Sequence, residues 1–451
     1  MSLEKRSNPF ITRFPPSPTG FLQMGNVRTA IYNYLLARKN GGQFLLRIED
    51  TDRERSTREF ETALLENLKW LGLTWDNAEV PRQSERNDVY KGYLQKLVKE
   101  GKAYVSKEDT KGDATKRAEV IRFKNPNTRV VFADMIRGQI EFDTTELGDF
   151  VIAKSMDEPI YHLAVVVDDF ESKVTHIVRG EDHISNTPRQ ILIQEAIGAP
   201  RPIYAHLPLI LDRERAKLSK RKHGEKVSLR HFEKEGYLPV AIVNYMAMLG
   251  WNPGGDNEIF SLSELIPIFD ITKVQKGGAI FDEEKLRWFN KEHLKKISNY
   301  QSLISKEIKK VLGEVDDEIV EKIAPIVFER ISTFGDIKKM NEEGELAYFF
   351  GSPEYDSSKL SWKDESKEKT KGHLESVLAL IQKAPEKDFT EAGIKNAIWK
   401  YAEEAGKGSV LWPLRFALSG REKSPDPFTL AFILGKEETE KRLETAIKKL
   451  S

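Results

Sequence analysis

The chain has 451 residues, enough for about three domains of ordinary size, and its 39% hydrophobic and 31% charged residues place it with globular rather than disordered proteins. Its 71 basic and 71 acidic side chains cancel, so net charge indicates no particular partner and any RNA binding has to depend on local patches. The absence of cysteine excludes disulfides and zinc sites built on thiolates.

The longest apolar runs, such as "LAVVV" and "LPLIL", are far shorter than the roughly 20 residues of a membrane span. The N-terminal stretch "MSLEKRSNPF" has no apolar core of signal-peptide length. The sequence therefore predicts a cytoplasmic protein without membrane association.

The first predicted unit is a strand, a helix and a second strand. Residues 10–14 form a strand candidate, apolar residues recur at helical spacing from Val27 to Leu35, and a second strand lies in "QFLLRIED". Between the first strand and the helix lies "FPPSPTGFLQMGN", which holds three prolines and two glycines. Because ligands of α/β sheets bind by preference at the carboxyl ends of strands, this loop is a candidate binding site.

A second α/β pattern follows an interruption. Alternating strand patterns such as "RVVFADMIRGQIEF" predict an inserted α+β subdomain over residues 86–159. After it, the apolar runs 163–167 and 175–178 are predicted to be buried strands and residues 187–198 a helix.

From residue 298 onward the pattern becomes helical. Leu374, Val377, Leu378 and Ile381 stand at i, i+3, i+4 and i+7, and the same spacing recurs from Ile394. The last third is therefore predicted to be an all-helical domain.

Three clusters are candidates for chemistry. The loop up to Asn26 precedes a helix whose N-terminus could bind an anion, although a Pro/Gly loop alone is more often a turn. The run "RIEDTDRERS" crowds carboxylates at a strand end, where they could hold an ammonium group or a metal, or form a solvated turn. The run "ERAKLSKRKHGEKVSLR" could neutralise phosphates, or be a basic surface loop.

Together these clusters resemble one family. The stretches "RFPPSPTGFLQMGNVRTAIYNYLLARKNGGQFLLRIEDTDRERS", "YHLAVVVDD", "VRGEDHISNTPRQ" and "KLSKR", in this order, are similar to those of class I glutamyl-tRNA synthetases. The similarity extends to "AIFDEEKLRWFNKEHL" and "PLRFALSGREKSPDPFTLAFILGKE", and so covers nearly the whole chain.

The resemblance implies an α/β fold with a split Rossmann-type parallel-sheet catalytic domain. The implied domains are a first catalytic half (1–85), an acceptor-stem-binding insert (86–159), a second catalytic half (160–205), a stem-contact region carrying the KLSKR loop (206–297) and an all-helical anticodon-binding domain (298–451).

It also implies a reaction. The carboxylate of L-glutamate would attack the α-phosphate of ATP, giving glutamyl-adenylate and pyrophosphate, and the glutamyl group would then pass to the terminal adenosine of tRNA(Glu). Mg²⁺ would arrive with ATP. The family suggests a monomer.

Site residues are carried over from the resemblance position by position. The side-chain carboxylate of glutamate would meet Arg13, Tyr161 and Arg179, and its ammonium group Ser17 and Glu49. Glutamate should be preferred because glutamine would leave a donor facing guanidinium donors. The catalytic residues would be Lys217, Lys220 and Gln23, and Arg330 is a candidate anticodon reader. The implied ATP-binding residues are Gln23, Gly25, Asn26, Asp182, His183, Leu209, Ile210, Lys217 and Lys220.

The chain departs from the family pattern at three points. Gln23 stands where the first signature has histidine, and Val165 stands where a polar residue often follows the site tyrosine. The optional cysteine-based zinc loop is absent, so no structural zinc is expected.

Two alternatives remain open. The enzyme could be non-discriminating or directed mainly at tRNA(Gln), since anticodon choice depends on a few side chains. The altered first signature also leaves open a non-catalytic RNA-binding paralogue, although the basic loop and the glutamate-site residues argue against it.

Overall fold

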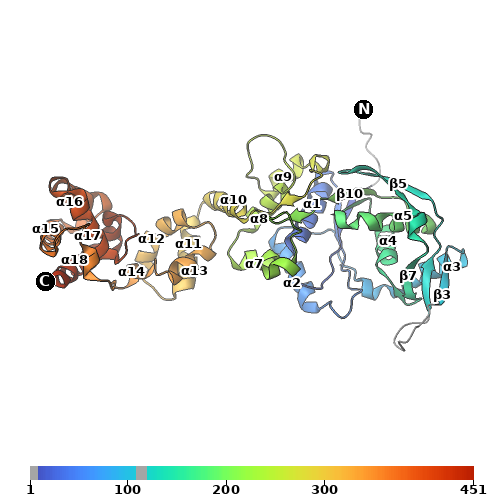
Figure 1. Ribbon diagram of the computed structural model, residues 1–451, viewed down its shortest axis with the longest axis horizontal. Helices are drawn as coiled ribbons and strands as arrows, with labels where there is room; N and C mark the ends of the chain where they lie inside the picture. The colour runs from blue at the N-terminus through green and yellow to red at the C-terminus, as the bar shows by residue number, and fades with distance from the viewer. Residues whose placement is uncertain (1–8, 108–118) are drawn as a thin grey trace. The chain divides into compact units, whose positions relative to one another are not determined.

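The computed structural model describes residues 9–107 and 119–451 and divides into two compact units, one up to His293 and one from Leu294 (Figure 1). Most of the N-terminal stretch on which the leader prediction rests, and positions 108–118 of the predicted insert, lie outside the described residues. The finer domain boundaries given above stay predictions.

The strand–helix–strand unit predicted at the N-terminus is present. It consists of β1 (Ile11–Phe14), α1 (Met24–Lys39) and β2 (Gln43–Leu46), and the two strands pair in parallel with Arg13 opposite Leu45. Met24, the first residue of α1, is fully buried, and its packing in the core holds this end of the helix in place. The loop that precedes α1 is thereby fixed at the carboxyl end of β1.

The second half of the sheet contains a hairpin from the predicted insert. The strand order is β6-β5-β10-β9, where β5 (Arg129–Asp134) and β6 (Gly138–Asp143) form the hairpin and β9 (His176–Gly180) and β10 (Ile203–Leu207) pair in parallel. The backbone N–H of Thr175 donates to Ile11 O over 3.0 Å, which joins β9 to β1. Strand alternation gave no signal of which strand the hairpin would pair with.

The prediction of a strand at residues 163–167 is wrong. These residues lie in α4 (Tyr161–Glu171), in which positions 163–169 are all buried. A short, continuous apolar run fits a buried strand and a buried helix equally well, and periodicity cannot separate the two. The predicted helix that follows is present as α5 (Thr187–Ile197), which ends at Gly198 in the left-handed conformation.

The first unit has further elements outside this sheet, and the last of them, α10, continues two residues past its boundary. Four strands form a separate antiparallel sheet in the order β3-β4-β7-β8. The bounds of the elements are α2 (Arg58–Trp70), α3 (Asn87–Lys99), β3 (Ala103–Lys107), β4 (Glu119–Phe123), β7 (Phe150–Ser155), β8 (Glu158–Pro159), β11 (Ile210–Leu211), α6 (Lys220–His223), α7 (Leu229–Lys234), α8 (Pro239–Met248), α9 (Leu262–Ile268), β12 (Ala279–Ile280) and α10 (Glu283–Lys295).

The second unit is helical, as predicted. Leu374, Val377 and Ile381 are buried along one face of α15, as their spacing required. The helices are α11 (Tyr300–Leu312), α12 (Asp317–Arg330), α13 (Gly335–Glu342), α14 (Ala347–Phe350), α15 (Lys367–Lys383), α16 (Glu391–Ala405), α17 (Lys407–Ser419) and α18 (Pro427–Leu450).

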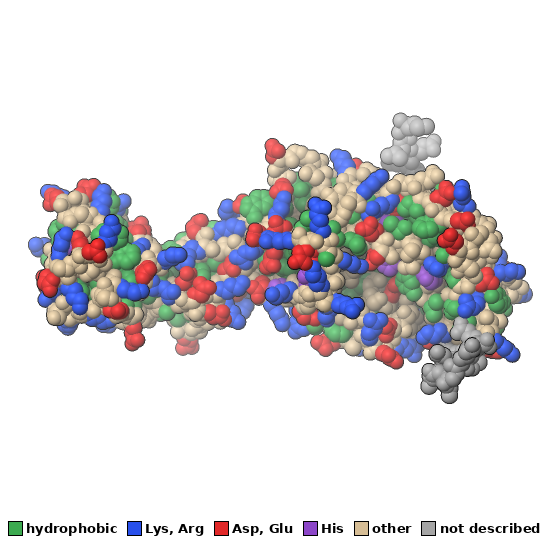
Figure 2. Space-filling view, in the orientation of Figure 1, with side chains coloured by type: hydrophobic (Ala, Val, Ile, Leu, Met, Phe, Trp, Pro, Cys, Tyr) green, Lys and Arg blue, Asp and Glu red, His purple; other side chains and the backbone are tan. Residues whose placement is uncertain are grey.

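Acidic and basic side chains are interspersed over the face seen in Figure 2, in keeping with the zero net charge. None of the described helices combines the length and the apolar character needed to cross a membrane.

Candidate active site

Side chains that follow different parallel strands meet at one edge of the sheet. Arg13 lies near the end of β1, Glu49 follows β2, and Arg179 lies near the end of β9. Parallel strands bring their carboxyl ends to the same edge, where ligands of open α/β sheets bind. The structure thus gathers three residues that the resemblance assigned to glutamate.

Arg179 is a buried cation held by neutral groups. It is 6% exposed, and its guanidinium donates to His206 Nε2 over 3.2 Å, Gln190 Oε1 over 2.7 Å and Thr187 Oγ1 over 2.8 Å. Among the described residues no carboxylate forms an ion pair with it. Burial lowers the pKa of Arg179, because the charged form lacks a counter-ion. The site therefore favours an anionic ligand.

Two more donors near Arg179 lack an acceptor among the described residues. Arg13 Nη1 is buried without a hydrogen-bond partner among the described residues. Gln190 Nε2 is also buried without a hydrogen bond of ordinary length, although it lies close enough to Tyr161 to affect the pKa of the hydroxyl. Donors that have no acceptor are costly when buried, and a carboxylate offers about four acceptor sites.

A chain of buried ion pairs holds Arg13 in place. Asp169 accepts from Arg13 Nε over 3.1 Å and from Arg47 Nη1 over 2.8 Å, and Arg47 Nη2 donates to Glu49 Oε1 over 2.8 Å. Burial raises the pKa of Glu49, while Arg47 opposes the rise. Arg47 and Glu49 are thus buried, and the interpretation of this run as a solvated turn is wrong for these two residues.

Asp168 contacts both the predicted insert and Arg47, the residue that follows β2. Its carboxylate is 1% exposed and accepts from Tyr90 Oη over 2.8 Å, Arg86 Nε over 2.8 Å and Gln83 Nε2 over 2.9 Å. Asp168 and Asp169 were missed from the sequence. No sequence signal pointed to them, because the preceding apolar run was assigned to a strand and their partners come from other elements.

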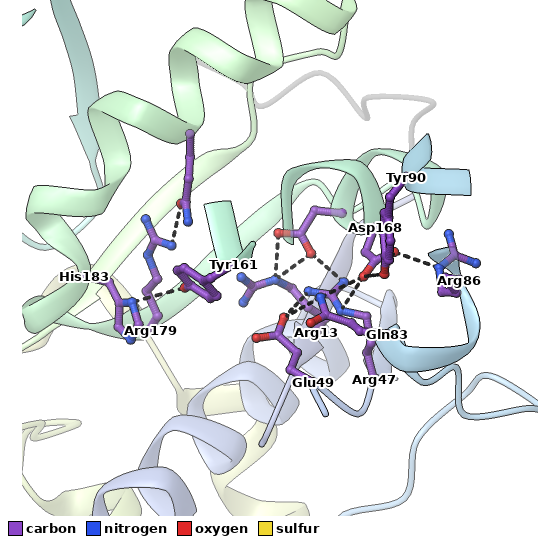
Figure 3. Close-up of polar contacts among 12 residues, drawn as sticks. Arg13, Arg47, Glu49, Gln83, Arg86, Tyr90, Tyr161, Asp168, Arg179 and His183 are labelled. Atoms are coloured by element: carbon purple, nitrogen blue, oxygen red, sulfur yellow. Dashed lines mark hydrogen bonds and ion pairs between the residues drawn. The ribbon is translucent and has the colours of Figure 1, made fainter. Parts of the chain in front are cut away.

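Tyr161 lies between two groups of polar side chains. Figure 3 places it with Arg179 and His183 on one side and Arg13 with Glu49 on the other. The Tyr161 hydroxyl is 3.2 Å from His183 Nδ1. Burial and the nearby Arg179 lower the pKa of His183 to about 4, so this ring is neutral at pH 7. Ser17 is exposed in the loop whose Pro16 carbonyl accepts from Glu49 N over 3.0 Å.

The loop before α1 leaves a helix N-terminus open. Gly25 and Asn26 are exposed, the first turn of α1 carries no acidic residue, and no side chain caps it. Gln23 donates from Nε2 to the Phe21 carbonyl over 2.9 Å, which leaves one N–H of this amide for another acceptor. Uncapped backbone N–H groups and the positive end of the helix dipole suit a phosphate.

The basic loop packs against this first loop. Leu229 N donates to Leu22 O over 2.8 Å, and Lys220 Nζ lies 3.9 Å from the position that a Cβ would take on Gly20. Lys217 pairs with Asp182 over 3.0 Å and Lys220 with Glu225 over 2.6 Å. Both pairs are about half exposed, so they hold the lysines only weakly.

The segment after β10 is held from three sides. Leu209 N donates to Glu181 Oε1 over 2.7 Å, Leu209 O accepts from Ala279 N over 3.0 Å, and Arg28 donates to the Pro208 carbonyl. Ile210 is buried at 5% exposure. This fixed apolar segment lies beside Asp182 and His183 in the turn after β9, because Glu181 joins the two segments.

Two residues singled out from the sequence do not belong to this cluster. Val165 is buried in the apolar core around α4, so it offers the site no polar contact. Arg330 belongs to the second unit, at the end of α12, where it pairs with Glu345. In the described part of the chain no three His, Asp or Glu side chains gather as they would around a metal ion.

Comparison with known proteins identifies relatives of nearly full length. Residues 10–111 and 105–288 match the family of tRNA synthetases class I (E and Q), catalytic domain, and residues 286–447 match an anticodon binding domain. The fold class expected from the sequence, an α/β catalytic domain followed by a helical anticodon-binding domain, is thereby confirmed.

Individual relatives agree with these matches. The chain is 41% identical to glutamate–tRNA ligase of Aquifex aeolicus (strain VF5), with 98% of this chain and 99% of the relative aligned. It is 38% identical to the corresponding ligase of Carboxydothermus hydrogenoformans over 96% of this chain and 98% of the relative. The crystal structure of a glutamate tRNA ligase from Elizabethkingia meningosepticum in complex with its amino acid superposes with a TM-score of 0.87 at 36% identity, covering 98% of this chain and 100% of the other.

Proposed function

The chain belongs to the class I glutamate–tRNA ligases, and on this premise we propose that it uses ATP to attach L-glutamate to tRNA(Glu) through a glutamyl-adenylate. The observation that carries the proposal is the buried guanidinium of Arg179, which has neutral partners and no ion pair among the described residues. A ligand carboxylate would supply the missing counter-charge.

Glutamate fits the remaining groups at both of its ends. Its side-chain carboxylate would accept from Arg179, Arg13 Nη1 and Tyr161, and its ammonium group would lie at Glu49 and Ser17. A glutamine amide would turn N–H groups toward buried N–H donors, which costs about 1–3 kcal/mol for each unsatisfied group. Glutamate is therefore the preferred substrate.

ATP would occupy the other side of the site. Its phosphates would lie at the N-terminus of α1, near Gln23, Gly25 and Asn26, and Lys217 and Lys220 would exchange their exposed carboxylate partners for phosphate oxygens. The adenine would lie against Leu209 and Ile210, close to Asp182 and His183. Mg²⁺ would arrive on the ATP phosphates, and a structural zinc remains unexpected.

The chemistry consists of two displacements. An oxygen of the glutamate α-carboxylate attacks the α-phosphorus of ATP, and the bond to the bridging oxygen of the β-phosphate breaks, so that pyrophosphate leaves. A ribose hydroxyl of the terminal adenosine then attacks the activated carbonyl and AMP leaves. Neither step needs a protein nucleophile, because positioning and neutralised oxygens lower the barrier.

The tRNA would contact both units. The anticodon domain match covers Arg330, which we propose as an anticodon reader once it exchanges Glu345 for RNA. Use of tRNA(Gln) stays an alternative, because the anticodon preference depends on few side chains. The monomeric state and the cytoplasmic location stay predictions.

A charging assay tests the proposal. The protein is incubated with ATP, Mg²⁺ and labelled glutamate, and tRNA(Glu) and tRNA(Gln) transcripts of known chargeability are supplied in separate reactions. Label on tRNA(Glu) alone is expected. Label on both, or mainly on tRNA(Gln), would favour the non-discriminating alternative. The absence of label on either would overturn the proposal and favour a non-catalytic paralogue.

A further inference from the structure

A buried carboxylate and a buried imidazole stand behind Arg179. His206, on β10, accepts from Arg179 Nε at its Nε2 atom over 3.2 Å, and its Nδ1 atom lies 2.6 Å from Asp134 Oδ2. The side chains of His206 and Asp134 are both 0% exposed. These contacts form a line from Asp134 through His206 to the guanidinium that the proposed function places on glutamate.

The backbone holds the carboxylate of Asp134 in its charged form. Ile136 N and Arg137 N donate to its Oδ1 over 2.9 Å each, and His206 N donates to its Oδ2 over 3.0 Å. Although burial opposes the shift, His206 and these amides hold the pKa of Asp134 below its usual value. Asp134 therefore stays an acceptor.

An acceptor at Nδ1 decides where the imidazole proton lies. A neutral histidine carries one N–H, so a carboxylate facing Nδ1 keeps the proton there and leaves Nε2 as a bare acceptor. Burial lowers the pKa of His206, which keeps the ring neutral, while Asp134 opposes this shift. Only this tautomer can accept from Arg179 Nε, because an arginine has donors and no acceptor.

We propose that Asp134 and His206 are positioning residues for glutamate recognition: they fix the imidazole tautomer that orients Arg179, so that its remaining N–H groups face the substrate carboxylate. Gln190 Oε1 and Thr187 Oγ1 hold two other N–H groups, and three of the five donors of Arg179 are thereby engaged. This inference rests on the proposed function. It extends the site to the β5–β6 hairpin, which the sequence assigned to the insert.

Two substitutions of similar size separate positioning from packing. His206→Gln can place an amide oxygen near the original Nε2 atom and accept from Arg179, whereas His206→Asn can face Asp134 but does not reach Arg179. The KM values for glutamate and for ATP are measured by charging of tRNA(Glu) with the full chain, and thermal unfolding verifies folding. His176→Asn is the matched control, because His176 is a buried histidine at the start of β9 whose partners are Thr175 and the stacked ring of Phe10.

The expected result is a split between the two substrates. His206→Asn should raise the KM for glutamate roughly 10- to 100-fold, the range for loss of a hydrogen bond to a charged group, with the KM for ATP within about threefold. His206→Gln should raise the KM for glutamate by less than about fivefold. Asp134→Asn alone should raise this KM by roughly tenfold. Combined with His206→Gln, Asp134→Asn should have little further effect, because no imidazole tautomer is left to fix.

Other outcomes overturn the inference. Equal effects of His206→Gln and His206→Asn, parallel increases in both KM values, or an effect of His176→Asn as large as that of His206→Asn would indicate packing alone. If Asp134→Asn does not fold, the His206 pair still decides. If the wild-type protein charges tRNA but His206→Gln and His206→Asn raise the KM for glutamate equally, only this inference is contradicted. If the wild-type protein is inactive, the proposed function is overturned, and this inference with it.

Discussion

Asp169 accepts from two buried arginines at once, with its Oδ1 atom 3.1 Å from Arg13 Nε and 2.8 Å from Arg47 Nη1. Arg13 lies in β1 opposite Leu45 of β2, Arg47 follows the end of β2, and the carboxylate comes from α4. This contact links residues that are 156 positions apart, and it leaves Arg13 Nη1 without a hydrogen-bond partner among the described residues.

Asp169→Asn should therefore weaken both folding and glutamate binding. Removing one partner of a buried ion pair costs about 3–5 kcal/mol, because a buried charge stays unpaired. We expect a loss of about that size in urea-induced unfolding and a higher KM for glutamate. An unchanged unfolding midpoint together with an unchanged KM for glutamate would show that Asp169 does not hold the two arginines in place.

The contribution of Asp169 to stability should also depend on pH. Burial would raise the pKa of Asp169, but Arg13 and Arg47 outweigh it and hold the pKa below the ordinary value. Its contribution to stability is thus fully present above about pH 4, the unfolded pKa, and is lost as pH falls through the folded pKa. The stability difference between wild type and Asp169→Asn should shrink in acid, and a difference that grows there would be inconsistent with this sign.

Glu49 should make the KM for glutamate sensitive to pH. Burial raises its pKa, with Arg47 in opposition, so the carboxylate becomes protonated at a higher pH than an exposed glutamate. A protonated carboxyl group no longer pairs with an ammonium group, and the KM for glutamate should rise as pH is lowered toward that pKa. Glu49→Gln should raise this KM about tenfold and remove the pH dependence. The KM for ATP, measured over the same pH range, is the control.

Lys220→Met should lower kcat on the order of 100-fold with little effect on stability. Its ion pair with Glu225 is about half exposed and contributes at most about 1 kcal/mol to folding. A cation beside phosphate oxygens on which charge develops stabilises the transition state by several times more. Lys222→Met is the matched control, since Lys222 is exposed on the same short helix and pairs with Asp212 and Glu214. Equal losses in the two variants would argue against a specific role for Lys220.

Gln23 is expected to act through its amide N–H. Gln23→Glu keeps the size of the side chain but removes the donor to the Phe21 carbonyl and adds a charge near the phosphates, so kcat should fall about 100-fold. Gln23→His restores the residue of the family signature and should keep kcat within a few-fold of wild type. A fully active Gln23→Glu protein would show that this side chain does not contact ATP.

Arg330→Ala should raise the KM for tRNA without changing the KM for glutamate. Arg330 is 42% exposed and pairs with Glu345, so its removal should cost little stability. Arg415→Ala on α17, which removes a partly exposed arginine of the same unit, serves as the comparison. If both variants bind tRNA as wild type does, Arg330 is not an anticodon reader.

The sequence by itself determined the family and several local elements. Helical spacing from residue 27 predicted α1, the apolar positions of residues 374–381 predicted the buried face of α15, and proline and glycine marked the loop between β1 and α1. Such features follow from the periods of 3.6 and 2 residues, which are properties of neighbouring residues and remain visible in a linear chain.

Only the tertiary structure decided which polar groups meet. The apolar run in α4 could equally have been a strand, and nothing in the alternation of β5 indicated its pairing with β10. The roles of Asp169, Gln190 and His206 were invisible, because each depends on a partner from another element. These contacts matter energetically because a buried charge or N–H group is costly without a partner. That partner is set by the tertiary fold and comes from a residue distant in sequence.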